Sequence, residues 1–100
     1  MKIKLLNGNT YNADMVTDYN ITMTVDLNEV SAILSDMTEE NMKKIELLDG
    51  SDVVCGEYVN KALDHAEMQT KGEQCELVLI MYDTVPVADE ILNILLGGAE

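Results

Sequence analysis

The sequence contains no tryptophan and no phenylalanine, and its only aromatic residues are four tyrosines. A core without large flat rings has to be filled by leucine, isoleucine, valine and methionine, and methionine alone contributes seven residues. These side chains adapt to irregular spaces, but they anchor a partner less sharply than aromatic rings do. Apolar residues still make up 47% of the chain, which is ordinary for a globular protein and argues against wholesale disorder.

Positive charge is also scarce, because arginine is absent and six lysines face 19 carboxylates. The formal net charge of −13 repels phosphate backbones and anionic lipid surfaces. Without arginine, the chain also lacks the side chain that best grips phosphate or carboxylate through two parallel hydrogen bonds. The composition therefore predicts neither direct nucleic-acid binding nor membrane binding.

Long hydrophobic runs are missing as well. The longest unbroken apolar run, 77–82, is far shorter than the roughly 20 residues that a membrane-spanning helix needs. The first residues alternate in polarity and do not form the apolar stretch of a secretory signal peptide. We expect a chain without a membrane span and without such a signal.

Cysteine is limited to Cys55 and Cys75, which form no Cys-x-x-Cys motif and have no histidines beside them. In a chain without a secretion signal, such residues are expected to be reduced and to pack in the core. A disulfide or a reactive thiol is the alternative, and the sequence leaves open whether the two ever pair.

What the sequence does contain is a near repeat. The hexapeptide IKLLNG at 3–8 returns as IELLDG at 45–50. Asn-Gly and Asp-Gly between alternating apolar residues are typical of tight type I′ β-hairpins. We therefore predict a hairpin that joins about 2–6 to 10–16, and a second one that joins about 43–48 to 53–60.

Further strands are expected after each hairpin. Residues 21–26 alternate, with Ile21, Met23 and Val25 inward, whereas 77–82 is apolar on both faces, as expected of a central strand covered on each side. Residues 62–70 precede that strand, and 71–73 reads as the turn that makes an extra hairpin in the second half.

Each half then ends in an expected helix. An apolar stripe at helical spacing is formed by Val30, Ile33, Leu34 and Met37. Asp26 and Glu29 have the spacing of a capping box before it. The second helix, 87–96, follows Pro86 and is closed by Gly97-Gly98, and 38–43 is expected to be a short helical turn between the halves.

These elements predict an α+β fold of mainly antiparallel β-sheet in a single domain, 1–100. The domain would consist of two hairpin-containing halves, about 1–42 and 43–100, each followed by a helix. Because the same order of elements follows each hexapeptide, we interpret the halves as a possible internal duplication.

Residues that carry chemistry are few. His65 is the only histidine, and we expect it to face solvent on a strand face shared with Leu63 and Glu67. Ser31, Ser35 and Ser51 lie outside any nucleophile-elbow context, and no glycine-rich phosphate loop is present. We therefore predict a non-enzyme with no catalytic, cofactor-binding or metal-binding residues and no small-molecule substrate.

The 49–52 stretch, Asp-Gly-Ser-Asp, has some likeness to part of a calcium loop. It lacks the alternating acidic ligands and the closing glutamate of that loop, so turn chemistry explains it.

A docking surface is expected on helix 87–96, whose apolar residues cover more than half of its circumference. The expected contact residues are Ile91, Leu92, Leu95 and Leu96. Such a wide apolar face predicts a protein partner or a homo-oligomer.

Three stretches carry a resemblance: the opening MKIKLLNG, the second IELLDG with Gly56-Glu57-Tyr58 after it, and the late strand 77–82. Together they resemble small proteins of bacteriophages and prophages that belong to the head and tail structural proteins and are β-rich. The resemblance implies a virion-associated role without catalysis, in the host cytoplasm or in the virion. The alternative is an acidic DNA mimic that inhibits a host nucleic-acid-binding protein, of the anti-restriction or anti-CRISPR type, because strand carboxylates repeat at a spacing close to that of phosphates.

Overall fold

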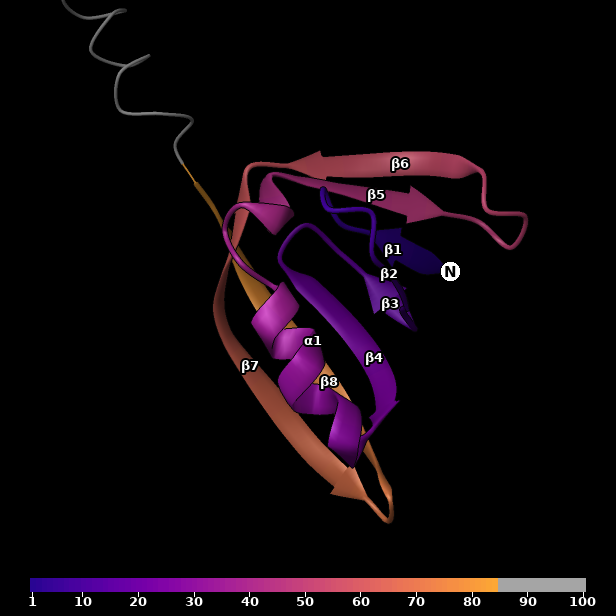
Figure 1. Cartoon of the computed structure of the whole chain (residues 1–100), viewed down its shortest axis with the longest axis vertical. Helices are drawn as coiled ribbons and strands as arrows, with labels where there is room; N and C mark the ends of the chain where they lie inside the picture. The colour runs from indigo at the N-terminus through magenta and orange to yellow at the C-terminus, as the bar shows by residue number, and fades with distance from the viewer. Residues whose placement is uncertain (85–100) are drawn as a thin grey trace, which may run out of the picture.

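The structure is a computed structural model that describes residues 1–84, and this part of the chain contains two four-stranded antiparallel sheets (Figure 1). The strand orders are β2-β1-β5-β6 and β3-β4-β8-β7. The strands are β1 (Lys2–Lys4), β2 (Thr10–Asn12), β3 (Met15–Val16), β4 (Asn20–Asp26), β5 (Lys44–Leu48), β6 (Val54–Val59), β7 (Lys61–Lys71) and β8 (Gln74–Asp83). The expected dominance of antiparallel sheet is confirmed.

The two sheets are continuous with each other at both edges. The chain passes from β2 into β3 through Ala13 and Asp14, whose N–H groups donate to the carbonyls of Met1 and Thr22 over 2.9 and 2.7 Å. It passes from β6 into β7 through Asn60, whose φ of 55° makes the sharp bend. Each edge strand thus continues into the other sheet, and the two sheets enclose one core.

That core contains aliphatic, methionine and cysteine side chains, as the composition predicts. Its fully buried members are Ile3, Leu5, Ile21, Met23, Met42, Ile45, Cys75, Leu77 and Leu79. Tyr11 and Tyr58 pack against it from its margin and stay half-buried. Inward-facing residues of β4 and β8 lie on adjacent strands, with Met23 opposite Leu77.

The segment between the sheets contains a 3₁₀ turn η1 (Leu27–Glu29), helix α1 (Val30–Asp36) and a second 3₁₀ turn η2 (Asn41–Lys43). The predicted apolar stripe is confirmed, because Val30, Ile33 and Met37 are buried and Leu34 packs beside them. In Figure 1, α1 is seen in front of β8, between β4 and β7. The predicted capping box is wrong: Asp26 precedes a 3₁₀ turn and makes no side-chain hydrogen bond to its backbone within residues 1–84.

Both Asn7-Gly8 and Asp49-Gly50 lie in strand-joining loops, but these loops are not type I′ turns. In the first, the Gly8 N–H donates to the Leu5 carbonyl and the Leu5 N–H donates to the Asn9 carbonyl, both over 2.9 Å. Gly8 has a φ of 92°, whereas Asn7 is not in the left-handed region. This is a three-residue loop in which a tight turn is followed by a left-handed residue.

The second hairpin repeats this geometry two residues further along than the sequence echo implies. The Asp52 N–H donates to the Asp49 carbonyl over 3.0 Å, and the Asp49 N–H donates to the Val53 carbonyl over 2.9 Å. Asp52, with a φ of 60°, occupies the position that Gly8 has in the first loop. The Asp49 side chain accepts the N–H groups of Ser51 and Val53, so turn chemistry accounts for this stretch.

The expected hairpin of 62–70 with the late strand is confirmed as β7 and β8, and β8 is central between β4 and β7. A bulge at Asp64 shifts the register, because Leu63 lies opposite Met81 while His65 lies opposite Ile80. The prediction that Leu63 shares a face with His65 is therefore wrong. Leu63 packs against the core, and His65 faces solvent as expected.

The strand expected at 10–16 is divided, because β2 pairs with β1 while β3 pairs with β4 in the other sheet. The two echoed segments are themselves neighbours, since β1 pairs with β5 in antiparallel fashion. The helix expected at 87–96 lies outside the described residues, as do Ile91, Leu92, Leu95 and Leu96.

Candidate interaction surface

The most apolar exposed strand edge in the described part is β6. Val53, Val54 and Val59 have relative exposures of 58%, 49% and 51%. Cys55 is also exposed. Within residues 1–84, β6 pairs with β5 on one side only, and Figure 1 shows it as the outermost strand of its sheet. An exposed edge with β-branched side chains is a template for pairing with another strand.

The pairing of β6 with β5 decides which backbone groups face outward. The Asn60 N–H donates to the carbonyl of Lys43, the residue before β5, over 2.9 Å, so this N–H points toward β5. In an antiparallel ladder these groups alternate in direction along a strand. The N–H and C=O groups of Val59 and Glu57 therefore point to the open edge.

The side chains of β6 alternate between the core face and the outer face of the sheet. Tyr58 lies opposite the fully buried Ile45 and packs against the core. Glu57 and Val59 lie opposite Glu46 and Lys44, on the outer face of the sheet. The open edge thus presents a carboxylate and a valine on one face, two residues apart.

The other long edge strand, β7, is differently built. It carries the exposed Asp64, His65, Glu67 and Lys71 and has the bulge at Asp64. Charged side chains and bulges are the common ways in which proteins keep sheet edges from pairing. The regular part of β6 carries one charged side chain, Glu57, so β6 is the less protected of the two edges.

Two carboxylates near this edge have lysines beside them. The Lys44 Nζ lies 3.9 Å from a Glu57 carboxylate oxygen, and the Lys2 Nζ lies 3.0 Å from an Asp52 carboxylate oxygen. Glu46 on β5 adds a further carboxylate to the same outer face. Lys4 on β1 lies opposite Glu46, and in the chain as a whole carboxylates outnumber lysines by 19 to six.

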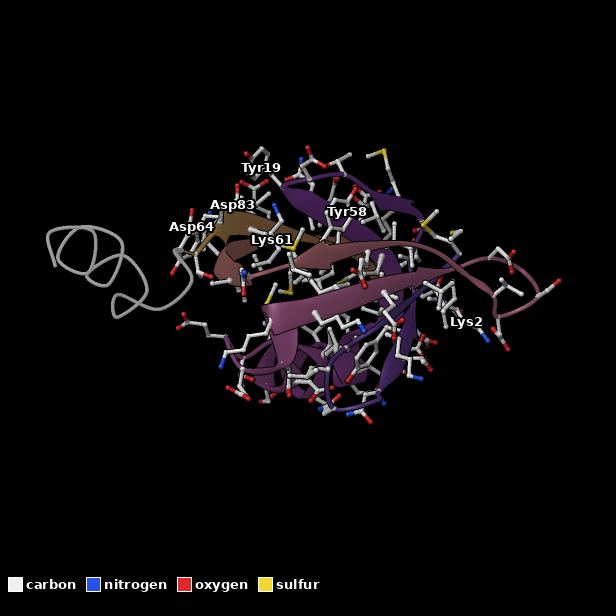
Figure 2. All side chains as sticks on the ribbon, turned by 90° about the horizontal axis from the view of Figure 1, so that it is seen from above. Lys2, Tyr19, Tyr58, Lys61, Asp64 and Asp83 are labelled. Carbon is white, nitrogen blue, oxygen red and sulfur yellow. The ribbon has the colours of Figure 1, made fainter. Side chains whose placement is uncertain are left out.

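A buried lysine marks the end of β6, where it passes into β7. Lys61 is 5% exposed, and its Nζ lies 2.6 Å from a carboxylate oxygen of Asp83. The same Nζ lies 4.6 Å from the ring centroid of Tyr19 and 5.6 Å from that of Tyr58 (Figure 2). Lys61 thus ties together β6, β7, β8 and the turn before β4, through one ion pair and two cation–π contacts.

Asp83 is the exposed member of this ion pair, and its pKa lies below the ordinary value mainly because Lys61 donates a hydrogen bond to it. Tyr19 adds a longer hydrogen bond, 3.3 Å, to the other carboxylate oxygen. A buried lysine could not be predicted from the sequence, since its burial depends on contacts between strands that are distant along the chain.

A second polar cluster joins the first hairpin to the end of α1. The Asp36 carboxylate accepts hydrogen bonds from the Tyr11 hydroxyl over 2.5 Å and from the side-chain amides of Asn7 and Asn9 over 2.8 Å each. Asn41 donates to the Asp36 carboxylate and to its carbonyl. Four side chains donate to this one carboxylate, so the cluster is a structural clamp.

The third cluster surrounds His65, whose Nδ1 lies 2.9 Å from an Asp64 carboxylate oxygen and whose Nε2 lies 3.5 Å from a Glu67 carboxylate oxygen. The pKa of His65 is raised, chiefly by the hydrogen bond to Asp64. No nucleophile is placed beside this imidazole in the described residues. Among residues 1–84, no group of three or more His, Cys, Asp or Glu side chains is placed to hold a metal ion.

The cysteines differ from each other. Cys75 is fully buried as expected, but Cys55 is exposed at the edge of β6, so its predicted core position is wrong. The bulge between β5 and β6 is the reason, because Leu47 lies opposite Gly56 and Leu48 opposite Val54, which leaves Cys55 without a cross-strand partner. The two thiols are free.

No helix within residues 1–84 has the length and apolar character needed to cross a membrane. Comparison of the chain with family models, with curated proteins and with solved structures finds no match.

Proposed function

We propose that the protein is a non-enzymatic assembly module that acts through protein–protein contacts, as a virion-associated component of a bacteriophage or prophage. The observation that carries the proposal is the exposed, valine-bearing edge of β6, with Val54 and Val59 about half exposed. A strand edge of this kind forms main-chain hydrogen bonds with a second strand, which is how many small β modules join larger assemblies.

The proposal includes an internal duplication of the two halves. Its support is the way in which the echoed segments pair: β1 and β5 run antiparallel, and Lys4 lies opposite Glu46, its own counterpart in the repeat. Two copies of one unit that associate about a twofold axis would pair in this manner. Tyr11 opposite Ile3 and Tyr58 opposite Ile45 add a second matching pair.

The test is the protein content of purified particles. We expect the full chain, quantified by mass spectrometry, to be present in density-purified particles in a fixed ratio to the main head or tail protein. The Val59→Lys variant should be depleted from them. Met68→Lys is the matched control, because Met68 is similarly exposed at 55% but lies on β7. Absence of the native protein from particles would contradict the virion assignment.

The salt dependence of binding distinguishes this function from that of a DNA-mimicking inhibitor. An apolar strand contact persists as the salt concentration rises, whereas binding that depends on rows of carboxylates weakens steeply. In the described part, five carboxylates are already within ion-pair distance of the chain's own lysines, at Glu40, Asp52, Glu57, Glu76 and Asp83. This leaves fewer of them to imitate phosphates, and we expect the particle-bound protein to resist a high-salt wash.

A further inference from the structure

We infer that the open edge of β6 takes up an extended, lysine- or arginine-bearing segment of a partner protein, which adds an antiparallel strand next to β6. This inference rests on the proposed function, and it specifies the chemistry of the partner at the same surface.

Main-chain pairing is the first part of the argument. The N–H and C=O groups of Glu57 and Val59 point to the open edge, because the Asn60 N–H donates to the Lys43 carbonyl on the β5 side and the direction alternates along β6 from there. An incoming strand therefore finds two residues with both backbone groups available. Antiparallel addition is favoured over parallel addition because its hydrogen bonds are better aligned.

The outward-facing side chains of β6 indicate which residues the partner strand should carry. A residue opposite Val59 meets an apolar surface, and a residue two positions further along the partner strand meets Glu57. Cross-strand pairs of β-branched residues and of opposite charges each stabilise a sheet. The partner segment should thus contain a β-branched apolar residue, any residue, and then lysine or arginine.

The net charge of the chain favours a cationic occupant over an acidic one. Lys44 and Lys2 lie beside Glu57 and Asp52, and Lys4 lies opposite Glu46, but carboxylates outnumber lysines by 19 to six in the chain as a whole. A second copy of this chain would bring its own net charge of −13 and, in a symmetric pairing centred on Glu57, would place two glutamates opposite each other. A cationic strand reduces this repulsion.

The experiment measures amide hydrogen exchange of the uniformly ¹⁵N-labelled full chain, residue by residue. The probe is a capped peptide in which threonine alternates with valine and lysine, so that valine and lysine share one face. The control peptide has glutamate in place of each lysine. At a peptide concentration about ten times its Kd, we expect the amides of Glu57 and Val59 to exchange about tenfold more slowly. The acidic peptide should leave them unchanged.

Variants test the two parts of the argument separately. Val59→Pro removes an edge-facing N–H without touching the ladder to β5 and should abolish binding of the basic peptide. Glu57→Lys keeps the backbone intact and should weaken binding about fivefold, the equivalent of about 1 kcal/mol for a lost cross-strand charge pair. Glu67→Lys on β7 is the matched charge reversal and should leave binding largely as it is.

Three results would overturn the inference. If both amides are already protected in the free monomer, the edge is occupied within the chain. If protection grows with protein concentration alone, the occupant is a second copy. If the basic and acidic peptides protect equally, or protect β7 instead, charge complementarity at β6 is wrong.

The inference and the proposed function fail in distinguishable ways. A protein that is stoichiometric in particles but does not bind the basic peptide at β6 overturns the inference alone. A protein that binds the peptide at β6 but is absent from particles supports the docking surface and overturns the virion assignment.

Discussion

The Tyr11 hydroxyl donates a 2.5 Å hydrogen bond to the Asp36 carboxylate, and this bond joins strand β2 to the last residue of helix α1. The carboxylate lies at the helix C-terminus, where the helix dipole disfavours negative charge. The hydrogen bonds from Tyr11 and from the amides of Asn7 and Asn9 offset that cost. Asp36 thus fixes the position of α1 relative to the first hairpin.

Replacing Asp36 with asparagine should lower the free energy of unfolding by about 1–3 kcal/mol, because partly buried donors lose a charged acceptor. Urea denaturation followed by circular dichroism measures this change. Asp18→Asn is the control, since Asp18 is an exposed carboxylate in a turn and its loss should change stability by less than about 0.5 kcal/mol. Equal effects of the two substitutions would show that the cluster is not a clamp.

The same pair predicts a pH dependence at both extremes. The pKa of Asp36 is lowered below 3.8, chiefly by the Tyr11 hydrogen bond, so its contribution to stability is present above that value and is lost as the pH falls through the folded-state pKa. Burial and Asp36 raise the pKa of Tyr11 from 10.0 to about 12. The Tyr11 contribution is therefore present below pH 10.0 and lost as the pH rises toward about 12, which tyrosinate absorbance of the native protein and of Tyr11→Phe can follow.

The ion pair of Lys61 and Asp83 should behave as a coupled unit. The Lys61 side chain is 6% exposed while that of Asp83 is 59% exposed, so removal of the carboxylate leaves a cation that water cannot reach. We expect Asp83→Ala to cost about 1–3 kcal/mol, less than for a fully buried pair because Asp83 is solvated. Lys61→Met keeps the contact with the rings of Tyr19 and Tyr58 and should cost less.

The double variant decides between coupling and independent effects. If the charge of Lys61 is the cause, Asp83→Ala should cost little once Lys61 has been replaced by methionine. Thermal unfolding of the four proteins gives the coupling free energy, and additive losses would show that Asp83 does not hold Lys61.

His65 should titrate above its ordinary pKa of 6.5 because Asp64, and to a smaller extent Glu67, favour the imidazolium. Its contribution to stability is present below pH 6.5 and is lost as the pH rises through the folded-state pKa, and it is small because the group is exposed to solvent. An NMR titration of the imidazole should show a larger fall in pKa for Asp64→Asn than for Glu67→Gln. The opposite order would contradict the hydrogen bond to Asp64.

The two cysteines should differ in reactivity. Cys55 is exposed on β6 and Cys75 is fully buried, so iodoacetamide should modify one thiol in the native protein and both in denaturant. Mass spectrometry of the intact chain counts the modifications. A native protein that takes up two labels, or none, would contradict the position of one of these residues.

Periodicity predicted the interior of the fold, because a side-chain pattern records burial directly. The inward row of β4 and the stripe of α1 follow from Ile21, Met23 and Ile33 without knowledge of distant contacts. The two bulges, at Asp64 and at Cys55, leave no mark in the pattern, since they depend on the partner strand. They moved Leu63 away from the face of His65 and Cys55 out of the core.

The open edge of β6 could not be predicted from the sequence either, because it depends on strand order and not on composition. Sequence reasoning instead placed the docking surface on Leu92 and its neighbours, which the described residues do not include. The absence of large aromatic rings did predict a core of aliphatic and methionine residues. It did not predict the use of Tyr58 and Tyr19 around Lys61, which comes from tertiary contacts.

The two glycines at matching positions of the echoed hexapeptides differ in backbone geometry. Gly8 has a φ of 92° and open space around it, so Gly8→Ala should cost about 1–2 kcal/mol purely through the left-handed backbone. Gly50 also has open space but no positive φ, so Gly50→Ala should change stability by less than about 0.5 kcal/mol. Gly8→Asn should recover part of the loss, because asparagine tolerates the left-handed region. Chemical denaturation of the three variants measures these differences, and equal costs at Gly8 and Gly50 would mean that the two loops share one turn after all.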